Sequence, residues 1–102
     1  MEQVFQQIDN YIQNNNIVLF MKGTKDLPMC GFSARIVHIF DQLNVVFYDI
    51  DVLSDDNIRE GIKQFSQWPT IPQLYVKGEF IGGCDIVSQM YADGSLQILF
   101  KI

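Results

Sequence analysis

Apolar side chains recur with helical spacing in some stretches of the chain and run without a break in others. Near the N-terminus, five of them fall on one helical face: Val4, Phe5, Ile8, Tyr11 and Ile12. This pattern predicts an amphipathic helix over residues 2–14. The next segment, IVLFM at 17–21, is apolar throughout, which is typical of a buried strand. A polar loop with glycine and proline, KGTKDLP at 22–28, follows it.

Past this loop the helical spacing returns in a second apolar stripe, made of Phe32, Ile36, Ile39, Phe40 and Leu43. The stripe predicts a helix over residues 30–43 with these side chains against the core. The segment VVFYDIDV at 45–52 predicts a second strand. Ser54 can then cap a helix over 55–66. Its inward-facing residues are Ile58, Ile62 and Phe65.

The C-terminal third of the chain predicts a hairpin followed by two helices. After the stiff connector WPTIP at 68–72, the segments LYV and EFI flank a Lys-Gly turn at 77–78 as two antiparallel strands. A helix then runs from near Asp85 to the glycine at position 94. The apolar segment SLQILF at 95–100 predicts a short last helix.

The order of these elements predicts an α/β fold. The first two strands are joined through a helix and should lie parallel with a right-handed crossover, whereas the last two form an antiparallel hairpin. A four-stranded mixed sheet flanked by about five helices follows, which is the layout of the thioredoxin fold. With 102 residues and no linker or low-complexity segment, the chain fits one domain.

Composition and charge exclude several classes of function. The net charge of −5, with scattered basic residues, opposes binding to phosphate backbones, so we expect no nucleic-acid partner. No apolar run approaches the roughly 20 residues of a membrane span, and the start MEQVFQQIDNYIQ resembles neither a signal nor a transit peptide. The two cysteines, with 53 residues between them, form no disulfide framework. We therefore expect a reducing, cytoplasmic location, where a thiol does chemistry or binds metal.

Cys30 lies between the polar loop and the expected start of the second helix. Open N–H groups and the positive end of the helix dipole stabilise a thiolate in such a place, and Lys22 can add a nearby cation. The other interpretation of Cys30 is a small buried apolar residue. The position favours the reactive thiol, because a cysteine at a helix start after a loop is usually accessible.

The redox motif Cys-x-x-Cys is absent, because Ser33 stands where the second thiol would be. Ser33 can form hydrogen bonds but cannot form a disulfide with Cys30. A mixed disulfide at Cys30 must therefore be resolved by an outside thiol, and glutathione is the abundant small one. Gly31 would let such a ligand approach the backbone closely.

Three motifs at these spacings resemble the monothiol glutaredoxins of the CGFS type: CGFS at 30–33, WPTIPQLYVKGEF at 68–80 and IGGCD at 81–85. The resemblance covers essentially the whole chain. It implies a single glutaredoxin domain over residues 1–102, a thioredoxin fold and a cis peptide bond before Pro72. It also implies that TKDLP in the polar loop is an insertion of this class that tilts glutathione away from productive attack.

The resemblance assigns glutathione contacts to five residues: Lys22, Arg59, Ile71, Cys84 and Asp85. Taken singly, each is explained equally well as a solvated charge, a core residue, a small residue or a helix cap. Taken together, they match the two carboxylates, the amine and the thiol of the ligand. The two cations would meet the glycyl carboxylate, and the Ile71 main chain would pair with the cysteinyl part like an added strand. The helix start at Cys84 and Asp85 would receive the other carboxylate and the amine.

A [2Fe–2S] cluster usually takes four thiolates, and Cys30 is the one suitable ligand in each chain. Two chains and two glutathione molecules complete the set, which predicts a glutathione-bridged homodimer with Cys30 as the metal ligand of the protein. Cys30 and Cys84 alone are too few for a metal site. We expect His38, the only histidine, to be exposed, and Trp68 to serve packing. The resemblance implies delivery of a labile cluster to iron–sulfur acceptor proteins, with a BolA-like partner replacing one subunit.

Two other functions compete with this carrier. A glutathione-dependent oxidoreductase would use the same groove to remove glutathione from protein thiols through a mixed disulfide at Cys30. An interaction module without chemistry would leave the groove unused, and the filled glutathione positions disfavour it. The TKDLP insertion favours the carrier over the oxidoreductase.

Overall fold

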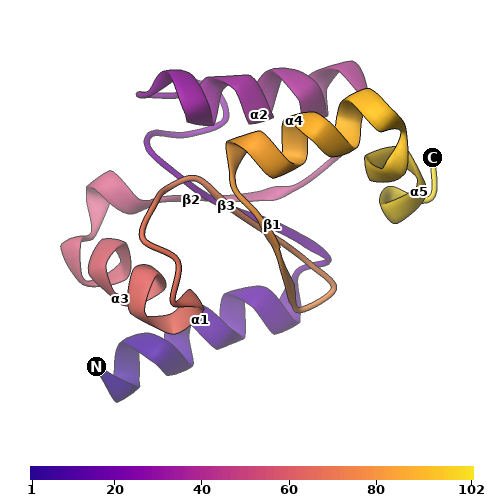
Figure 1. The fold of residues 1–102 in the computed structure, drawn as a ribbon. Coiled ribbons are helices and arrows are strands. Elements are labelled where there is room, and N and C mark those ends of the chain that lie inside the picture. The colour runs from indigo at the N-terminus through magenta and orange to yellow at the C-terminus, as the bar shows by residue number, and fades with distance from the viewer.

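A four-stranded sheet lies between two layers of helices in the computed structural model, which describes residues 1–102 (Figure 1). In chain order the elements are α1 (Glu2–Asn14), β1 (Ile17–Met21), α2 (Gly31–Gln42), β2 (Tyr48–Asp51), the 3-10 turn η1 (Val52–Ser54), α3 (Asp56–Ser66), β3 (Gln73–Val76), β4 (Glu79–Gly82), α4 (Cys84–Asp93) and α5 (Ser95–Phe100). No helix combines the length and the apolar character that crossing a membrane requires.

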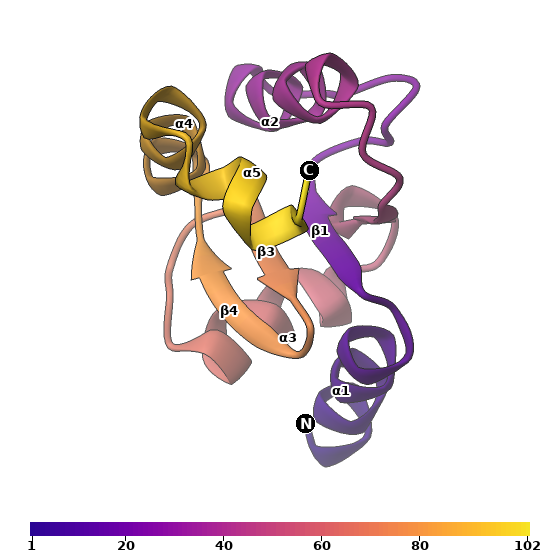
Figure 2. The ribbon, with the colours of Figure 1, turned by 90° about the vertical axis from the view of Figure 1, so that its right-hand side faces the viewer.

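The strands are ordered β2-β1-β3-β4, so β1 and β3 are central and β2 and β4 form the edges. Figure 2 shows β3 between β1 and β4. β1 pairs parallel with β2, to which it is connected through α2. It also pairs antiparallel with β3, and β3 pairs antiparallel with β4. This confirms the predicted mixed sheet and thioredoxin fold. β1 ends where the antiparallel β3 begins, with Phe20 opposite Gln73. The residues that follow β1 and those that precede β3 therefore meet at the same end of the two central strands.

The fully apolar strand β1 is buried on both faces, and its side chains alternate between two cores. Ile17, Leu19 and Met21 pack against α2, α4 and α5, whereas Val18 and Phe20 pack against α1 and α3. Each fully buried side chain of this size stabilises the fold by about 1.5–3 kcal/mol relative to exposure. The two helix layers therefore hold β1 at the centre of the molecule, and the loop that leads to Cys30 starts from the end of this strand (Figure 1).

The second strand is shorter than the sequence predicts, covering Tyr48–Asp51 rather than residues 45–52. The main-chain N–H of Val45 donates to Phe40 O, so the start of the predicted strand belongs to the turn that ends α2. At the other end, a carboxylate oxygen of Asp51 accepts from the N–H of Leu53 and turns the chain into η1. Local hydrogen bonds thus shorten the strand from both sides.

Three further predictions, all about the first residues of helices, were wrong. Asp55, not Ser54, caps α3, because its carboxylate accepts from the N–H groups of Asn57 and Ile58. Cys30 is the N-cap of α2 rather than a residue of its first turn. Phe32 does not belong to the buried stripe, since 64% of its surface is exposed. It lies in the first turn of α2, two residues after the N-cap and ahead of the part of the helix that packs on the sheet.

Most other local predictions are confirmed. The Lys77 and Gly78 turn adopts positive φ angles of 52° and 83°, which suits a tight hairpin. Gly94 ends α4 in the left-handed conformation with φ of 86°. His38 is exposed on the outer face of α2.

Gly61 in α3 provides a test of how closely α1 and α3 pack. Alanine normally favours a helix over glycine by about 1 kcal/mol. Here an added Cβ would collide with Cγ1 of Val4, so we expect Gly61→Ala to lower the free energy of unfolding by about 1 kcal/mol or more in urea titration. In a Val4→Ala background the same substitution should be neutral or stabilising. Stabilisation by Gly61→Ala alone would contradict the close contact.

Candidate functional site

The thiol of Cys30 takes the place of a capping oxygen at the start of α2. Cys30 has extended backbone angles, with φ of −151° and ψ of 151°, as N-cap residues do. Its Sγ accepts a hydrogen bond from the main-chain N–H of Ser33 at 3.4 Å. The sulfur therefore satisfies one of the open N–H groups of the helix and lies in the positive field of the helix start.

Ser33 supports this sulfur with its side chain as well. The hydroxyl is fully buried and lies 3.5 Å from Cys30 Sγ. Its oxygen also accepts a hydrogen bond from the main-chain N–H of Lys22 at 3.1 Å. Because a serine hydroxyl can accept and donate at once, the Lys22 bond leaves its hydrogen free to point at a thiolate. Ser33 thus joins the end of β1 to the thiol.

The pKa of the Cys30 thiol is lowered by these contacts. Partial burial works against the thiolate, but hydrogen bonds outweigh it: those from the Ser33 side chain and main chain, then that from the Phe32 main chain. The positive charge of Lys22 adds to the lowering of the Cys30 pKa. A larger fraction of Cys30 is therefore ionised at neutral pH than of an ordinary cysteine, which is the form that attacks disulfides and binds metals.

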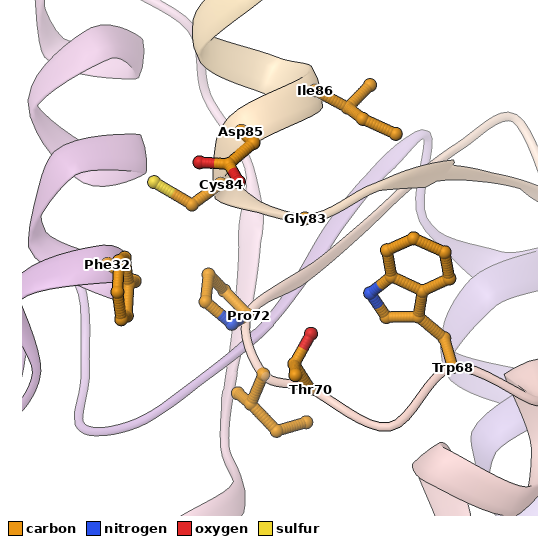
Figure 3. A pocket seen from close by; sticks show the side chains of 9 residues that line it. Phe32, Trp68, Thr70, Pro72, Gly83, Cys84, Asp85 and Ile86 are labelled. Atoms are coloured by element: carbon orange, nitrogen blue, oxygen red, sulfur yellow. The ribbon is translucent and has the colours of Figure 1, made fainter.

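A hollow of about 200 Å³ lies between the start of α2 and the start of α4 (Figure 3), and Cys30 is not among its lining residues. Its lining comes from three segments, namely Phe32, Trp68–Pro72 without Pro69, and Gly83–Ile86. In Figure 3, Phe32 and Trp68 lie on opposite sides of Pro72, with Cys84 and Asp85 above it. The volume is below the roughly 300–1,000 Å³ of pockets that enclose a drug-sized ligand, so the hollow can receive part of such a ligand and not all of it.

The floor of the hollow is held by a buried amide. Gln73 is fully buried, and its Nε2 donates to the carbonyl oxygens of Trp68 at 3.0 Å and Thr70 at 3.1 Å. Ser66 Oγ accepts from the N–H of Trp68 at 3.1 Å. The Ile71–Pro72 peptide bond is cis, as the resemblance implied. These contacts fix the connector between α3 and β3 from both ends.

The start of α4 offers unoccupied main-chain donors to the hollow. Its N-cap is Gly83, which provides no side-chain cap, so the first N–H groups of this helix are open. An added Cβ at Gly83 would lie 3.2 Å from the carbonyl oxygen of Pro72. A glycine therefore lets the α4 start and the connector approach each other closely.

The predicted site residues fall into three groups. Ile71, Cys84 and Asp85 line the hollow. Lys22 stands beside Cys30, joined to it through Ser33. Arg59 lies on α3 and is not part of the lining. Neither Lys22 nor Arg59 forms an ion pair, since the only one in the chain joins Lys63 to Glu60, and Arg59 Nε is buried without a hydrogen-bond partner.

Sequence reasoning predicted three of the nine residues that line the hollow as site residues and missed the other six. Its lining also contains Phe32, which was expected in the core, and Trp68, which was expected only to pack. Trp68 does pack, with its ring 5.6 Å from that of Phe80, but it also faces the hollow (Figure 3). The motif WPTIP was the available signal, because a stiff connector before a strand presents its side chains at the sheet edge.

Comparison with known proteins agrees with this geometry. The family model of glutaredoxin matches residues 17–81. The chain is 54% identical over 97 residues to a protein of Rickettsia felis named probable monothiol glutaredoxin 2, covering 95% of this chain and 93% of that protein. The chain therefore belongs to the glutaredoxin family. The single cysteine of its CGFS segment agrees with the monothiol type of this relative.

Two solved structures share the fold. The solution structure of reduced poplar apo GrxS14 has a TM-score of 0.82 and 46% identity, covering 94% of this chain and 88% of that one. The crystal structure of a buckwheat glutaredoxin–glutathione complex has a TM-score of 0.85 and 28% identity, covering 96% of this chain and 87% of that one.

The Ser33 hydroxyl gives a direct test of the thiol environment. Ser33→Ala removes the side-chain hydrogen bond to the sulfur, so we expect the pKa of Cys30 to rise towards its ordinary value. The rate of alkylation by iodoacetamide, followed against pH, should then reach its midpoint at higher pH and fall several-fold at neutral pH. Ser88→Ala, near Cys84 at 3.9 Å, is the matched control and should leave the profile unchanged. An unchanged profile in Ser33→Ala would show that the main-chain donors suffice.

Proposed function

We propose that this chain binds glutathione and, as a glutathione-bridged homodimer, carries a labile [2Fe–2S] cluster to iron–sulfur acceptor proteins. One observation carries the proposal: hydrogen bonds at the start of α2 lower the pKa of the Cys30 thiol and so favour its thiolate, while the side chain three residues on is a hydroxyl at 3.5 Å. Such a thiolate can bind metal or form a mixed disulfide, but it cannot close a disulfide with its neighbour.

Unpaired cations support glutathione as the ligand. The chain as a whole is acidic, with a net charge of −5, which opposes the approach of an anion. Lys22 and Arg59 nevertheless have no acidic partner within ion-pair distance. We assign the glycyl carboxylate to these two side chains, because the Arg59 guanidinium can bind a carboxylate bidentately and the Lys22 ammonium can add a charge-assisted hydrogen bond.

The hollow supports the remaining contacts. The main-chain groups of Ile71 take part in none of the loop hydrogen bonds of the chain, so they can pair with the cysteinyl residue of an extended tripeptide. The open N–H groups at Cys84 and Asp85 suit the γ-glutamyl carboxylate, and the Asp85 carboxylate suits its amine. A glutathione in this orientation would occupy the hollow with one end only and extend towards Lys22.

The ligand set for a cluster supports a dimer. No three histidine, cysteine, aspartate or glutamate side chains are grouped in a way that could hold a metal ion. A [2Fe–2S] cluster usually takes four thiolates, so Cys30 from each of two chains and the thiols of two glutathiones would be needed. Two exchangeable ligands make such a cargo labile. A BolA-like protein is the proposed partner that replaces one subunit, and the cytoplasmic location stays a prediction.

The lowered pKa of Cys30 also supports a second function, removal of glutathione from protein thiols. The Cys30 thiolate would attack the glutathione sulfur of the protein–glutathione disulfide, releasing the protein thiolate and leaving glutathione bound to Cys30. A second glutathione thiolate would then attack that bound glutathione sulfur, releasing the Cys30 thiolate and glutathione disulfide. Both functions use the same groove, and they differ in whether iron and sulfide are bound.

Charge reversal tests the glutathione contacts. The double variant Lys22→Glu with Arg59→Glu should weaken glutathione binding about tenfold or more in isothermal titration calorimetry, because repulsion replaces two attractive contacts. Lys77→Glu with Lys101→Glu changes the net charge equally at exposed positions away from the hollow and should retain the parent affinity. Equal affinity in all three proteins would reject the assigned carboxylate contacts.

Substitution of each cysteine tests the cluster. After anaerobic reconstitution with iron, sulfide and glutathione, Cys30→Ser should stay colourless and monomeric, because the only protein ligand is lost. Cys84→Ser should keep the visible absorption of a cluster and the dimer mass in native mass spectrometry. A coloured Cys30→Ser protein, or a monomer with stoichiometric iron and sulfide, would contradict the shared ligand set. A parent protein that stays colourless with glutathione would leave the oxidoreductase as the better function.

A further inference from the structure

The loop between β1 and Cys30, residues 22–29, is closed on itself by main-chain hydrogen bonds. Thr24 and Leu27 exchange N–H to carbonyl bonds of 3.1 Å in both directions, and the N–H of Met29 donates to Lys22 O at 2.8 Å. Such a closed loop has a defined shape of its own. Its orientation relative to the rest of the molecule must come from other contacts.

Side-chain acceptors outside the loop provide those contacts. The N–H of Lys22 donates to Ser33 Oγ at 3.1 Å, and the next N–H, that of Gly23, donates to Asp51 Oδ1 at 2.9 Å. Further along, the N–H of Lys25 donates to Asp49 Oδ2 at 2.8 Å. Two consecutive N–H groups are thus tied in two directions, one to the hydroxyl beside the thiol and one to a carboxylate at the sheet edge.

The same oxygen of Asp51 has a second partner. Asp51 is the last residue of β2 and lies opposite Met21, the last residue of β1. Its Oδ1 accepts from the N–H of Leu53 at 2.9 Å as well as from Gly23. Leu53 belongs to η1, the turn that leads into α3. One carboxylate oxygen therefore links the loop that carries Lys22 to the segment that leads to the helix carrying Arg59.

We propose that Asp51 is a positioning residue of the thiol site: its Oδ1 sets Lys22 beside Cys30 and fixes the loop of Lys22 relative to the helix of Arg59. This inference rests on the proposed glutathione site for its second half, because both cations would meet one carboxylate of the ligand. Its first half, the placement of Lys22 beside the thiol, does not depend on glutathione.

Gly23 makes the Asp51 contact possible. Its φ of 87° is in the left-handed region, where glycine is favoured. An added Cβ would lie 2.7 Å from Met29 N and collide with Leu27 O. The loop can therefore turn its Gly23 N–H towards Asp51 and still close on itself only with a glycine at this position.

A plain capping role is the alternative explanation for Asp51. An N-cap of η1 needs only the bond to Leu53, and serine is a good N-cap with a shorter side chain. Asp51→Ser should therefore retain the cap and lose the longer reach to Gly23. Asp51→Asn keeps an acceptor oxygen at the same position and removes only the charge. Asp51→Ala removes both hydrogen bonds.

These three variants separate position from charge. Two readouts are used on the full chain: glutathione affinity by calorimetry, and the rate at which iodoacetamide alkylates Cys30 at neutral pH. If Asp51 positions the loop, Asp51→Ser and Asp51→Ala weaken glutathione binding about tenfold, which is the scale of one lost hydrogen bond. Both variants also alkylate more slowly than the parent, because Lys22 is no longer held near the sulfur, whereas Asp51→Asn matches the parent in both readouts.

A charge effect would have the opposite sign. Loss of a negative charge near the site should strengthen the binding of an anionic ligand and favour the thiolate, so faster alkylation and tighter binding in all three variants would overturn the proposal. Parent-like values in Asp51→Ser would overturn it too, since the cap alone would then be sufficient. If Asp51→Ala fails to fold, Asp51→Ser decides the question.

Failure of the glutathione proposal would give results that differ from failure of the role of Asp51. The parent and all variants would then show no glutathione binding, while the alkylation rates would still test the placement of Lys22. If the parent binds glutathione and Asp51→Ser matches it in both readouts, the glutathione site stands and the role of Asp51 is rejected.

Discussion

A thiolate at the start of a helix needs hydrogen-bond donors around it, and in this chain the buried hydroxyl of Ser33 lies where it can donate to one. It lies 3.5 Å from the sulfur of Cys30 and also accepts the N–H of Lys22. The helix α2, the end of β1 and the loop between them are thereby set relative to one another through a single oxygen atom. The two cores around β1 contribute indirectly, because they keep this strand from shifting along the sheet.

The fold brings together, near Cys30, two parts of the chain that are far apart in the sequence. One is the thiol and its loop after β1, and the other is the connector before β3 with the start of α4 after β4. Since β1 and β3 are antiparallel neighbours, the end of the first lies beside the start of the second. A ligand placed between them would contact the hydrogen-bonded surroundings of Cys30 and also the hollow, whose lining includes Phe32 from the thiol side and Trp68 from the connector.

Much of this fold could be predicted from the sequence, because the spacing of apolar residues in a long segment usually fits either a helix or a strand and not both. The helices, the central strand and the hairpin were located this way, and the chain order limited the topology. The errors lie at the ends of elements. There, single hydrogen bonds or the exposure of a first helical turn decide the structure, and the spacing of apolar residues carries no information about either. Asp51 and Asp55 moved element boundaries through their carboxylates, and Phe32 left the core because it lies in the first turn of α2. The hollow was only partly foreseen, since it forms from segments that meet only after folding.

The enclosure of Ser33 also has a consequence for how this scaffold can change its chemistry. Serine and cysteine differ by one atom, and the side chain at position 33 is already fully enclosed and directed at the sulfur of Cys30. A sulfur there would be within a small movement of the 2.03–2.05 Å needed for a disulfide, roughly 1.5 Å less than the present Oγ to Sγ separation of 3.5 Å. A disulfide between positions 30 and 33 is thus prevented in this chain by one oxygen atom in place of a sulfur.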